Sequence, residues 1–232
     1  MKTLAVIQHT SAEYLGLIED HLEGRRIRFR YSRPFTAGGK LPAPEALNDG
    51  LVLLGGGPWG SAGERNVPTL EREVALTRHA LENGLPVLGI GLGAQILAIA
   101  AGGGSSRSDL QFEVGEAIRT RPDALAGFLP VRYPLVTYGR DRPELPPGAD
   151  VLAHDAAGRP ALFQVGDRAL GFTGHPGTKP AIVEDLIMEF DEGPPDVGPG
   201  LERLRAVRVA LEDALVPIMT GIVRVLGLMD QP

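Results

Sequence analysis

The sequence predicts an α/β fold with three layers, in which a mostly parallel sheet is flanked by helices. Two observations predict it: short apolar runs alternate with amphipathic segments as far as residue 101, and closely spaced short strands follow. Strands separated by helices form right-handed βαβ units, whose sheet is covered on both faces. With 232 residues, 43% hydrophobic and 22% charged, the chain has the size and composition of one such domain.

In the first half of the chain, the pattern predicts a strict alternation of strands and helices. Apolar residues at helical spacing between residues 11 and 22, preceded by Thr10 or Ser11 as a cap, predict the first helix. The helix expected at 69–83 has Gly84 as its stop signal. Strands are expected at 3–8, 26–31, 51–54 and 86–90, and helices at 11–22, 69–83 and 92–101.

After three consecutive glycines at 102–104, the pattern favours antiparallel additions and a helical C-terminus. A stripe of Leu, Ile and Val predicts one long helix at 201–226, which Pro217 is expected to kink or split. We therefore expect an α/β domain over 1–190, and a linker and C-terminal helical extension over 191–232 packed on the same domain. Strands are expected at 112–120, 131–138, 150–154, 161–165 and 170–173, a helix at 179–190 and a linker at 191–200.

The composition excludes several classes of function. The formal net charge of −6 argues against a nucleic-acid binder, and the chain has no cysteine for disulfides, thiolate metal sites or thiol nucleophiles. The spacing of the histidines indicates no metal site, and we expect no cofactor. No apolar run reaches the ~20 residues that span a bilayer, and the N-terminus reads as a strand rather than a signal peptide. We expect no membrane association and a cytoplasmic location.

Three motifs lie where strands end. Gly55-Gly56-Gly57-Pro58 follows one strand, Gly89-Ile90-Gly91-Leu92-Gly93-Ala94-Gln95 forms a strand-to-helix turn, and Gly171-Phe172-Thr173-Gly174-His175-Pro176 ends the sheet. A strand-to-helix turn of this kind carries the nucleophile in many hydrolases. In this order the motifs resemble the class I glutamine amidotransferases, most closely the small proteins similar to the amidotransferase domain of GMP synthase. The resemblance covers nearly the whole chain and implies a flavodoxin-like fold.

The resemblance implies a role for each matched position. The family's nucleophilic Cys corresponds to Gly91, its catalytic His to His175, and the Glu that orients this His to Gly177. The backbone N–H groups that stabilise the oxyanion correspond to Gly56 or Gly57 and to Leu92. Gln95 matches a family glutamine at the start of the helix that follows the turn.

Two of the three catalytic side chains are therefore absent. Removal of one triad member can cost on the order of a million-fold in rate, so we expect no ordinary glutaminase activity. Our first hypothesis is a degenerate amidotransferase-like protein that acts as a binding, regulatory or accessory subunit of a biosynthetic pathway. The second is an enzyme with altered chemistry, amide hydrolysis or acyl or amino transfer, that uses His175 and the backbone amides of the turn.

Several assignments stay open at the level of the sequence. Trp59 either fills the old substrate pocket or serves as a stacking platform, and Gln95 is either a helix residue or a ligand contact. Arg140, Asp141 and Arg142 form either a solvated turn or a new charge pattern in the pocket. The C-terminal helix either packs on its own domain only or also contacts a protein partner or a second copy.

Overall fold

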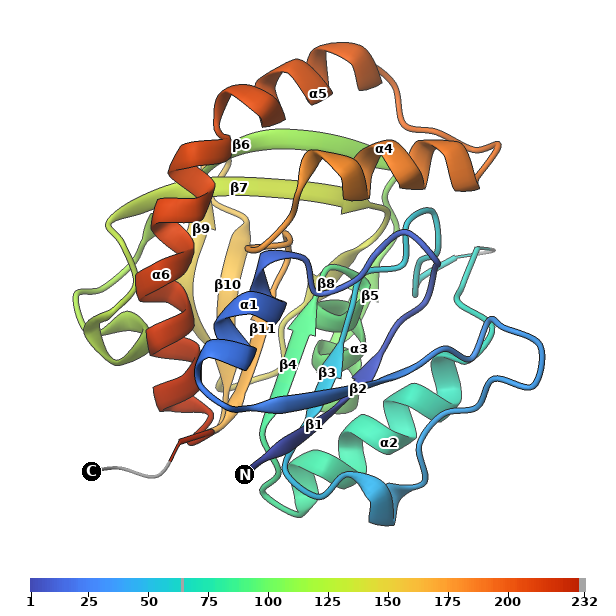
Figure 1. The fold of residues 1–232 in the computed structure, drawn as a ribbon, viewed down its shortest axis with the longest axis vertical. Coiled ribbons are helices and arrows are strands. Elements are labelled where there is room, and N and C mark those ends of the chain that lie inside the picture. The colour runs from blue at the N-terminus through green and yellow to red at the C-terminus, as the bar shows by residue number, and fades with distance from the viewer. Residues whose placement is uncertain (64, 230–232) are drawn as a thin grey trace.

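A computed structural model describes residues 1–63 and 65–229, and its centre is a nine-stranded sheet of order β2-β1-β3-β4-β11-β10-β9-β6-β7 (Figure 1). The first five strands in that order are parallel, and the remaining four pair antiparallel. The predicted mixture of a parallel sheet with antiparallel additions in the second half is confirmed. Their bounds are β1 Thr3–Ile7, β2 Arg28–Ser32, β3 Leu51–Leu53, β4 Val87–Ile90, β6 Gln111–Arg119, β7 Arg132–Gly139, β9 Asp150–Asp155, β10 Pro160–Val165 and β11 Ala169–Phe172.

Helices cover both faces of this sheet. One apolar cluster joins the sheet to α1 (Leu17–Gly24) and α6 (Arg208–Val225), and a second joins it to α2 (Leu70–Glu82) and α3 (Leu92–Ala100). The three predicted layers therefore correspond to two separate cores. The remaining elements are η1 Pro44–Ala46, η2 Ala124–Gly127, α4 Pro180–Glu189, α5 Val197–Ala206, and the small β5–β8 sheet of Gly104–Ser106 and Arg142–Glu144.

The helix expected at 11–22 is wrong in its first half. The helix begins at Leu17, after Gly16 adopts φ 62° and ψ −129°, a backbone conformation that no helix contains. Residues 11–16 instead run from the end of β1 across the carboxyl edge of the sheet as irregular backbone. Their side chains and carbonyls are used for contacts with distant parts of the chain, which local apolar spacing does not reveal.

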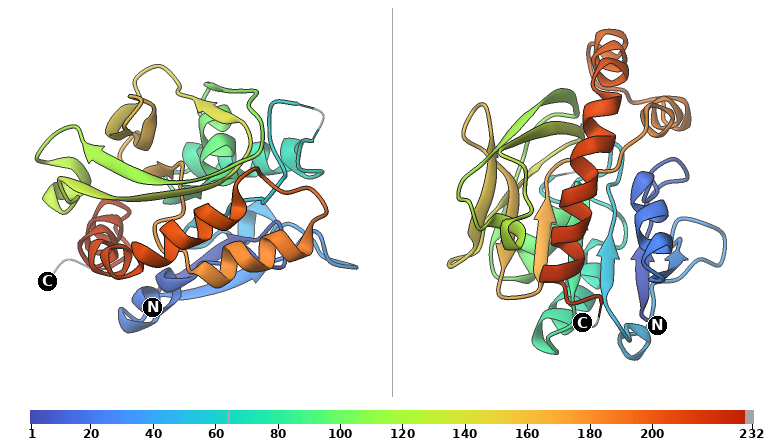
Figure 2. Two further views of the ribbon diagram at one scale, coloured as in Figure 1. Left: turned by 90° about the horizontal axis from the view of Figure 1, so that it is seen from above. Right: turned by 60° about the vertical axis from the view of Figure 1, so that its left-hand side comes forward.

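The helix expected at 201–226 is broken, but the break falls at Val207 rather than at Pro217. The linker expected at 191–200 is wrong from Val197 onward, where α5 begins, and residues 191–196 are not helical. Pro217 lies inside α6, while the buried residues Leu211, Leu215 and Ile218 face the core. Figure 2 shows α6 running the length of one side of the molecule. Much of the apolar stripe is thus used in packing on the sheet, and Val209 and Val216 stay exposed.

Among residues 1–63 and 65–229, no helix has the length and apolar character that crossing a membrane requires.

Two helical glycines give a matched test of this packing. A Cβ at Gly221 in α6 would lie 2.7 Å from the Leu125 carbonyl oxygen in η2, whereas a Cβ at Gly198 in α5 would meet no atom within 4 Å. Gly221→Ala is expected to lower the free energy of unfolding by about 1–3 kcal/mol through overpacking. Gly198→Ala is expected to raise it by about 0.5–1 kcal/mol through helix propensity. Urea denaturation measures both, and equal effects of the two substitutions would contradict this packing of α6.

Candidate functional site

The candidate site lies where neighbouring parallel strands end. β1, β3, β4 and β11 are adjacent in the sheet, so the loops that follow them meet at one edge. These loops carry His9, Gly55–Gly57, Gly91 and His175. This is the position at which open α/β sheets bind their ligands.

Gly91 forms the turn between β4 and α3 as the sequence predicts. It adopts φ 57° and ψ −115°, and its N–H donates to the Phe172 carbonyl at 2.8 Å. Side chains rarely adopt this backbone conformation, which costs ~1–3 kcal/mol for a residue other than glycine. A Cβ here would lie 3.3 Å from the Cα of Gly55. The turn thus has the strained backbone expected from the sequence, and glycine removes its conformational cost.

A pocket of about 280 Å³ opens beside this turn. Its wall includes Gly91 together with loops and strands of the second half of the chain, among them β7 and β8. We call it the elbow pocket. The five residues expected to bind a ligand all line it: Gly56, Gly57, Trp59, Leu92 and Gln95.

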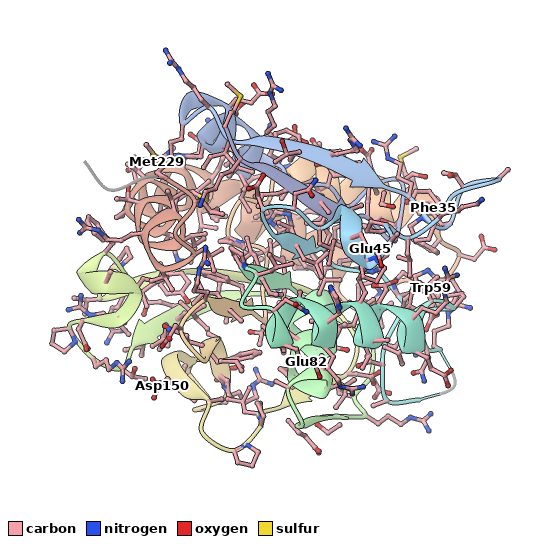
Figure 3. All side chains as sticks on the ribbon, turned by 90° about the horizontal axis from the view of Figure 1, so that it is seen from below. Phe35, Glu45, Trp59, Glu82, Asp150 and Met229 are labelled. Carbon is pink, nitrogen blue, oxygen red and sulfur yellow. The ribbon has the colours of Figure 1, made fainter. Side chains whose placement is uncertain are left out.

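Trp59 is part of the elbow-pocket wall, and one face of its ring is occupied by a neighbour. The guanidinium carbon of Arg65 lies 4.7 Å from the Trp59 ring centroid, a cation–π contact. Figure 3 shows Trp59 at the periphery of the molecule. The ring therefore borders an open pocket and does not fill it.

Gln95 is held by the protein itself. Its side-chain amide donates to the Arg140 carbonyl at 2.8 Å, and its carbonyl oxygen accepts from the Ser61 hydroxyl at 2.6 Å. Asp141 fixes the same wall, because its carboxylate accepts from the N–H groups of Ser61, Ala62 and Ser108 at 2.8, 2.9 and 3.1 Å. Asp141 is buried, so the interpretation of a solvated turn is wrong at this position.

His175 is buried, and both of its ring nitrogens have partners in the backbone. Nε2 lies 2.8 Å from the Tyr14 carbonyl oxygen, and Nδ1 accepts the Gly177 N–H at 3.2 Å. A carbonyl only accepts and an N–H only donates, so the ring is neutral with its proton on Nε2. Burial lowers the pKa of His175 to about 4, which keeps the ring neutral near pH 7.

No space remains at Gly177 for the glutamate that the sequence resemblance leads one to expect there. A Cβ there would lie 2.7 Å from Cγ1 of Ile18 and 3.0 Å from its backbone nitrogen. The Gly177 carbonyl also accepts the Leu17 N–H at 2.8 Å. The segment that leads into α1 therefore packs against Gly177, and its Tyr14 carbonyl serves as the acceptor for His175.

Glu13, in the same segment, occupies one of the backbone N–H groups that the resemblance assigns to oxyanion binding. Its Oε2 accepts the Gly57 N–H at 3.0 Å, and the residue is only 4% exposed. Burial raises the pKa of the Glu13 carboxyl to about 7, although the Gly57 N–H favours the ionised form. Glu13 also lines a cavity of about 10 Å³ with Gly91 and His175, which we call the inner cavity.

A buried ion pair between His9 and Glu73 supports the Gly55–Gly57 loop. His9 donates from Nδ1 to the Gly55 carbonyl at 3.0 Å and from Nε2 to the Glu73 carboxylate at 2.7 Å. Burial by itself lowers the pKa of His9, and it is the largest single influence, but the charge and hydrogen bond of Glu73 and the Gly55 carbonyl together outweigh it and raise the pKa. Because both nitrogens face acceptors, His9 is an imidazolium. Glu73 also accepts the Thr69 hydroxyl.

The sequence did not identify Glu13, the role of the Tyr14 backbone or the His9–Glu73 pair. Glu13 was hidden because its segment reads as the first turn of an amphipathic helix. The available signal was Gly16, a residue with low helix propensity that often marks an unusual backbone conformation.

Comparisons with known proteins agree with the fold. The model of the family "Glutamine amidotransferase class-I" matches residues 21–168. A GMP synthase [glutamine-hydrolyzing] of Thermomicrobium roseum is 35% identical over 128 residues, covering 54% of this chain and 23% of that protein. The enzyme of the same name from Bifidobacterium longum is 30% identical over 184 residues, covering 77% and 32%. The chain thus spans at most about a third of these relatives' length.

Solved structures resemble the chain over its whole length. A glutamine amidotransferase of Methylobacillus flagellatus superposes with a TM-score of 0.81 at 24% identity, covering 100% of this chain and 97% of that one. A glutamine amidotransferase of Thermotoga maritima gives a TM-score of 0.71 at 25% identity, covering 97% and 96%.

Acid titration tests the state of His175. Its pKa is about 4 in the folded protein and 6.5 as a free side chain, so its contribution to stability is complete above pH 6.5 and is lost as the pH falls toward 4. When the pH is lowered from 7 to 5, the free energy of unfolding of the wild type is expected to fall by about 2 kcal/mol more than that of His175→Gln. Urea denaturation at both pH values measures this difference. Parallel pH dependence of the two proteins would contradict a buried neutral histidine.

Proposed function

The chain belongs to the class I glutamine amidotransferase family, and we propose that it is a catalytically degenerate member, which does not hydrolyse glutamine and binds a small molecule in the elbow pocket. In this role it acts as a binding, regulatory or accessory subunit of a biosynthetic pathway. The proposal goes beyond family membership, because it depends on what this chain's own residues do at the turn.

The observation that carries the proposal is that His175 and the Gly57 N–H, two of the groups left from the hydrolytic machinery, already have partners within the chain. The His175 ring is hydrogen-bonded to the Tyr14 carbonyl and the Gly177 N–H, and the Gly57 N–H is hydrogen-bonded to the Glu13 carboxylate. Hydrolysis by this family's route needs a nucleophile, a base within reach of it and free N–H donors for the oxyanion. At Gly91 the nucleophile is missing, and the contacts of the other two groups compete with any such role.

The alternative is an enzyme with altered chemistry that uses His175 and the backbone amides. The open elbow pocket favours it, since a substrate of small-molecule size fits a space of about 280 Å³. The pKa of His175, about 4, argues against the enzymatic alternative, because a base of this pKa is poorly matched to proton transfer near pH 7. We therefore place the binding function first.

Release of ammonia from L-glutamine by the purified protein tests the proposal. The wild type is expected to release no more ammonia than a buffer blank, and His175→Ala is expected to match it. Metal-independent turnover by the wild type that disappears in His175→Ala would refute the binding function and support the enzymatic alternative.

Restoring the family's side chains gives a second prediction. Gly91→Cys combined with Gly177→Glu is expected to stay inactive, because the new carboxylate must displace Ile18, whose backbone nitrogen lies 3.0 Å from the added Cβ. The double variant is also expected to unfold at a lower temperature than Gly91→Cys alone. Recovery of glutaminase activity in the double variant would mean that Ile18 and the start of α1 move readily and that the pocket is still shaped for glutamine.

A further inference from the structure

The inner cavity is a small enclosed space that the lost glutaminase chemistry does not explain. Its volume of about 10 Å³ suits one water-sized polar group. Gly91, Tyr138 and Thr173 line both the inner cavity and the elbow pocket, so the two spaces adjoin at the turn. A side chain at position 91 would stand at this junction, and glycine leaves it open.

The polar groups around the inner cavity define what it can hold. Among its lining residues, those with ionisable side chains are Glu13, Tyr138 and His175. His175 is neutral and engaged on both nitrogens. The Tyr138 hydroxyl is buried and has no hydrogen-bond partner among the described residues. Glu13 is held by the Gly57 N–H through one oxygen, Oε2.

Within residues 1–63 and 65–229, Glu13 forms no ion pair with a cation. His9 is the nearest buried cation, and its Nε2 is paired with Glu73 at 2.7 Å. Any anion in the inner cavity would meet a carboxylate there and find the Gly57 N–H already taken. A group with several N–H donors and a positive charge would meet a carboxylate and a free hydroxyl oxygen, the partners that an ammonium group prefers.

We propose that the inner cavity binds the primary ammonium group of a small ligand, which enters from the elbow pocket past Gly91 and is held by the Glu13 carboxylate and the Tyr138 hydroxyl. This inference rests on the proposed binding role of the elbow pocket and names the chemical class of its ligand, a primary alkylamine. The rest of the ligand lies in the elbow pocket, against Trp59 and Leu92.

The binding is expected to strengthen with pH. Glu13 is surrounded by charged and polar groups from several elements. These are His9 after β1, the Gly57 N–H after β3, Tyr138 on β7, His175 after β11 and Glu189 on α4. Burial sets the pKa of Glu13 at about 7, while a primary alkylamine stays protonated to about pH 10, as lysine does. Because the cation binds the ionised carboxylate, affinity is expected to rise roughly tenfold between pH 6 and pH 8.

Calorimetry and thermal unfolding with n-butylamine test the proposal, with butyramide as a neutral probe that has the same four-carbon chain and a terminal nitrogen. The wild type is expected to bind and be stabilised by the amine and not by the amide. Glu13→Gln, which keeps an acceptor for the Gly57 N–H, and Tyr138→Phe are each expected to weaken amine binding about tenfold or more. Glu45→Gln removes the same charge from an exposed turn (labelled in Figure 3) and is expected to bind like the wild type.

Several results would overturn the inference. These are equal stabilisation by n-butylamine and butyramide, unchanged amine binding in Glu13→Gln, or no binding of the amine by the wild type. If Glu13→Gln does not fold, binding by the wild type that is independent of pH between 6 and 8 serves as the contradicting result. Ammonia release from glutamine is measured separately, so a failed amine site and a failed binding function give different outcomes.

Discussion

The packing of residues 13–17 against the loop at 175–177 is the constraint on which the rest of the site depends. The Leu17 N–H donates to the Gly177 carbonyl at 2.8 Å, and the Tyr14 carbonyl accepts from His175 at the same distance. A Cβ at position 177 would lie 2.7 Å from Cγ1 of Ile18, so glycine at 177 lets the start of α1 approach this loop closely.

This packing leads to the chemistry of the site. It buries His175 as a neutral ring and brings Glu13 to the Gly57 N–H, over a loop that the His9–Glu73 pair supports. A buried carboxylate needs hydrogen bonds or a charge partner, and Glu13 has one N–H at 3.0 Å and a neighbouring cation already paired elsewhere. The turn at Gly91 therefore borders a space that contains a buried carboxylate, and this supports the proposed binding of an ammonium group.

The sequence predicted the place where the site forms better than it predicted the backbone of residues 11–16. Apolar runs located β1, β3, β4 and β11, and the carboxyl ends of such strands meet, so Gly56, Gly57, Gly91 and Leu92 gathered as expected. The helix expected at 11–22 failed because Gly16 adopts a positive φ, and this segment carries Glu13 and Tyr14. The hydrogen bond between His175 and Tyr14 joins residues that are 161 positions apart in the sequence. Such a contact depends on tertiary packing, which local periodicity does not encode. The break at Val207 was missed for the same reason.

The state of His175 tests the account most directly. Nitrogen NMR of the imidazole ring reports both its protonation and the nitrogen that carries the proton. The account predicts a neutral ring with the proton on Nε2 that stays neutral from pH 8 down to pH 5, because its pKa is about 4. A ring that gains a proton near the free value of 6.5, or that carries its proton on Nδ1, would contradict the contact with Tyr14 and return His175 to the role of a base.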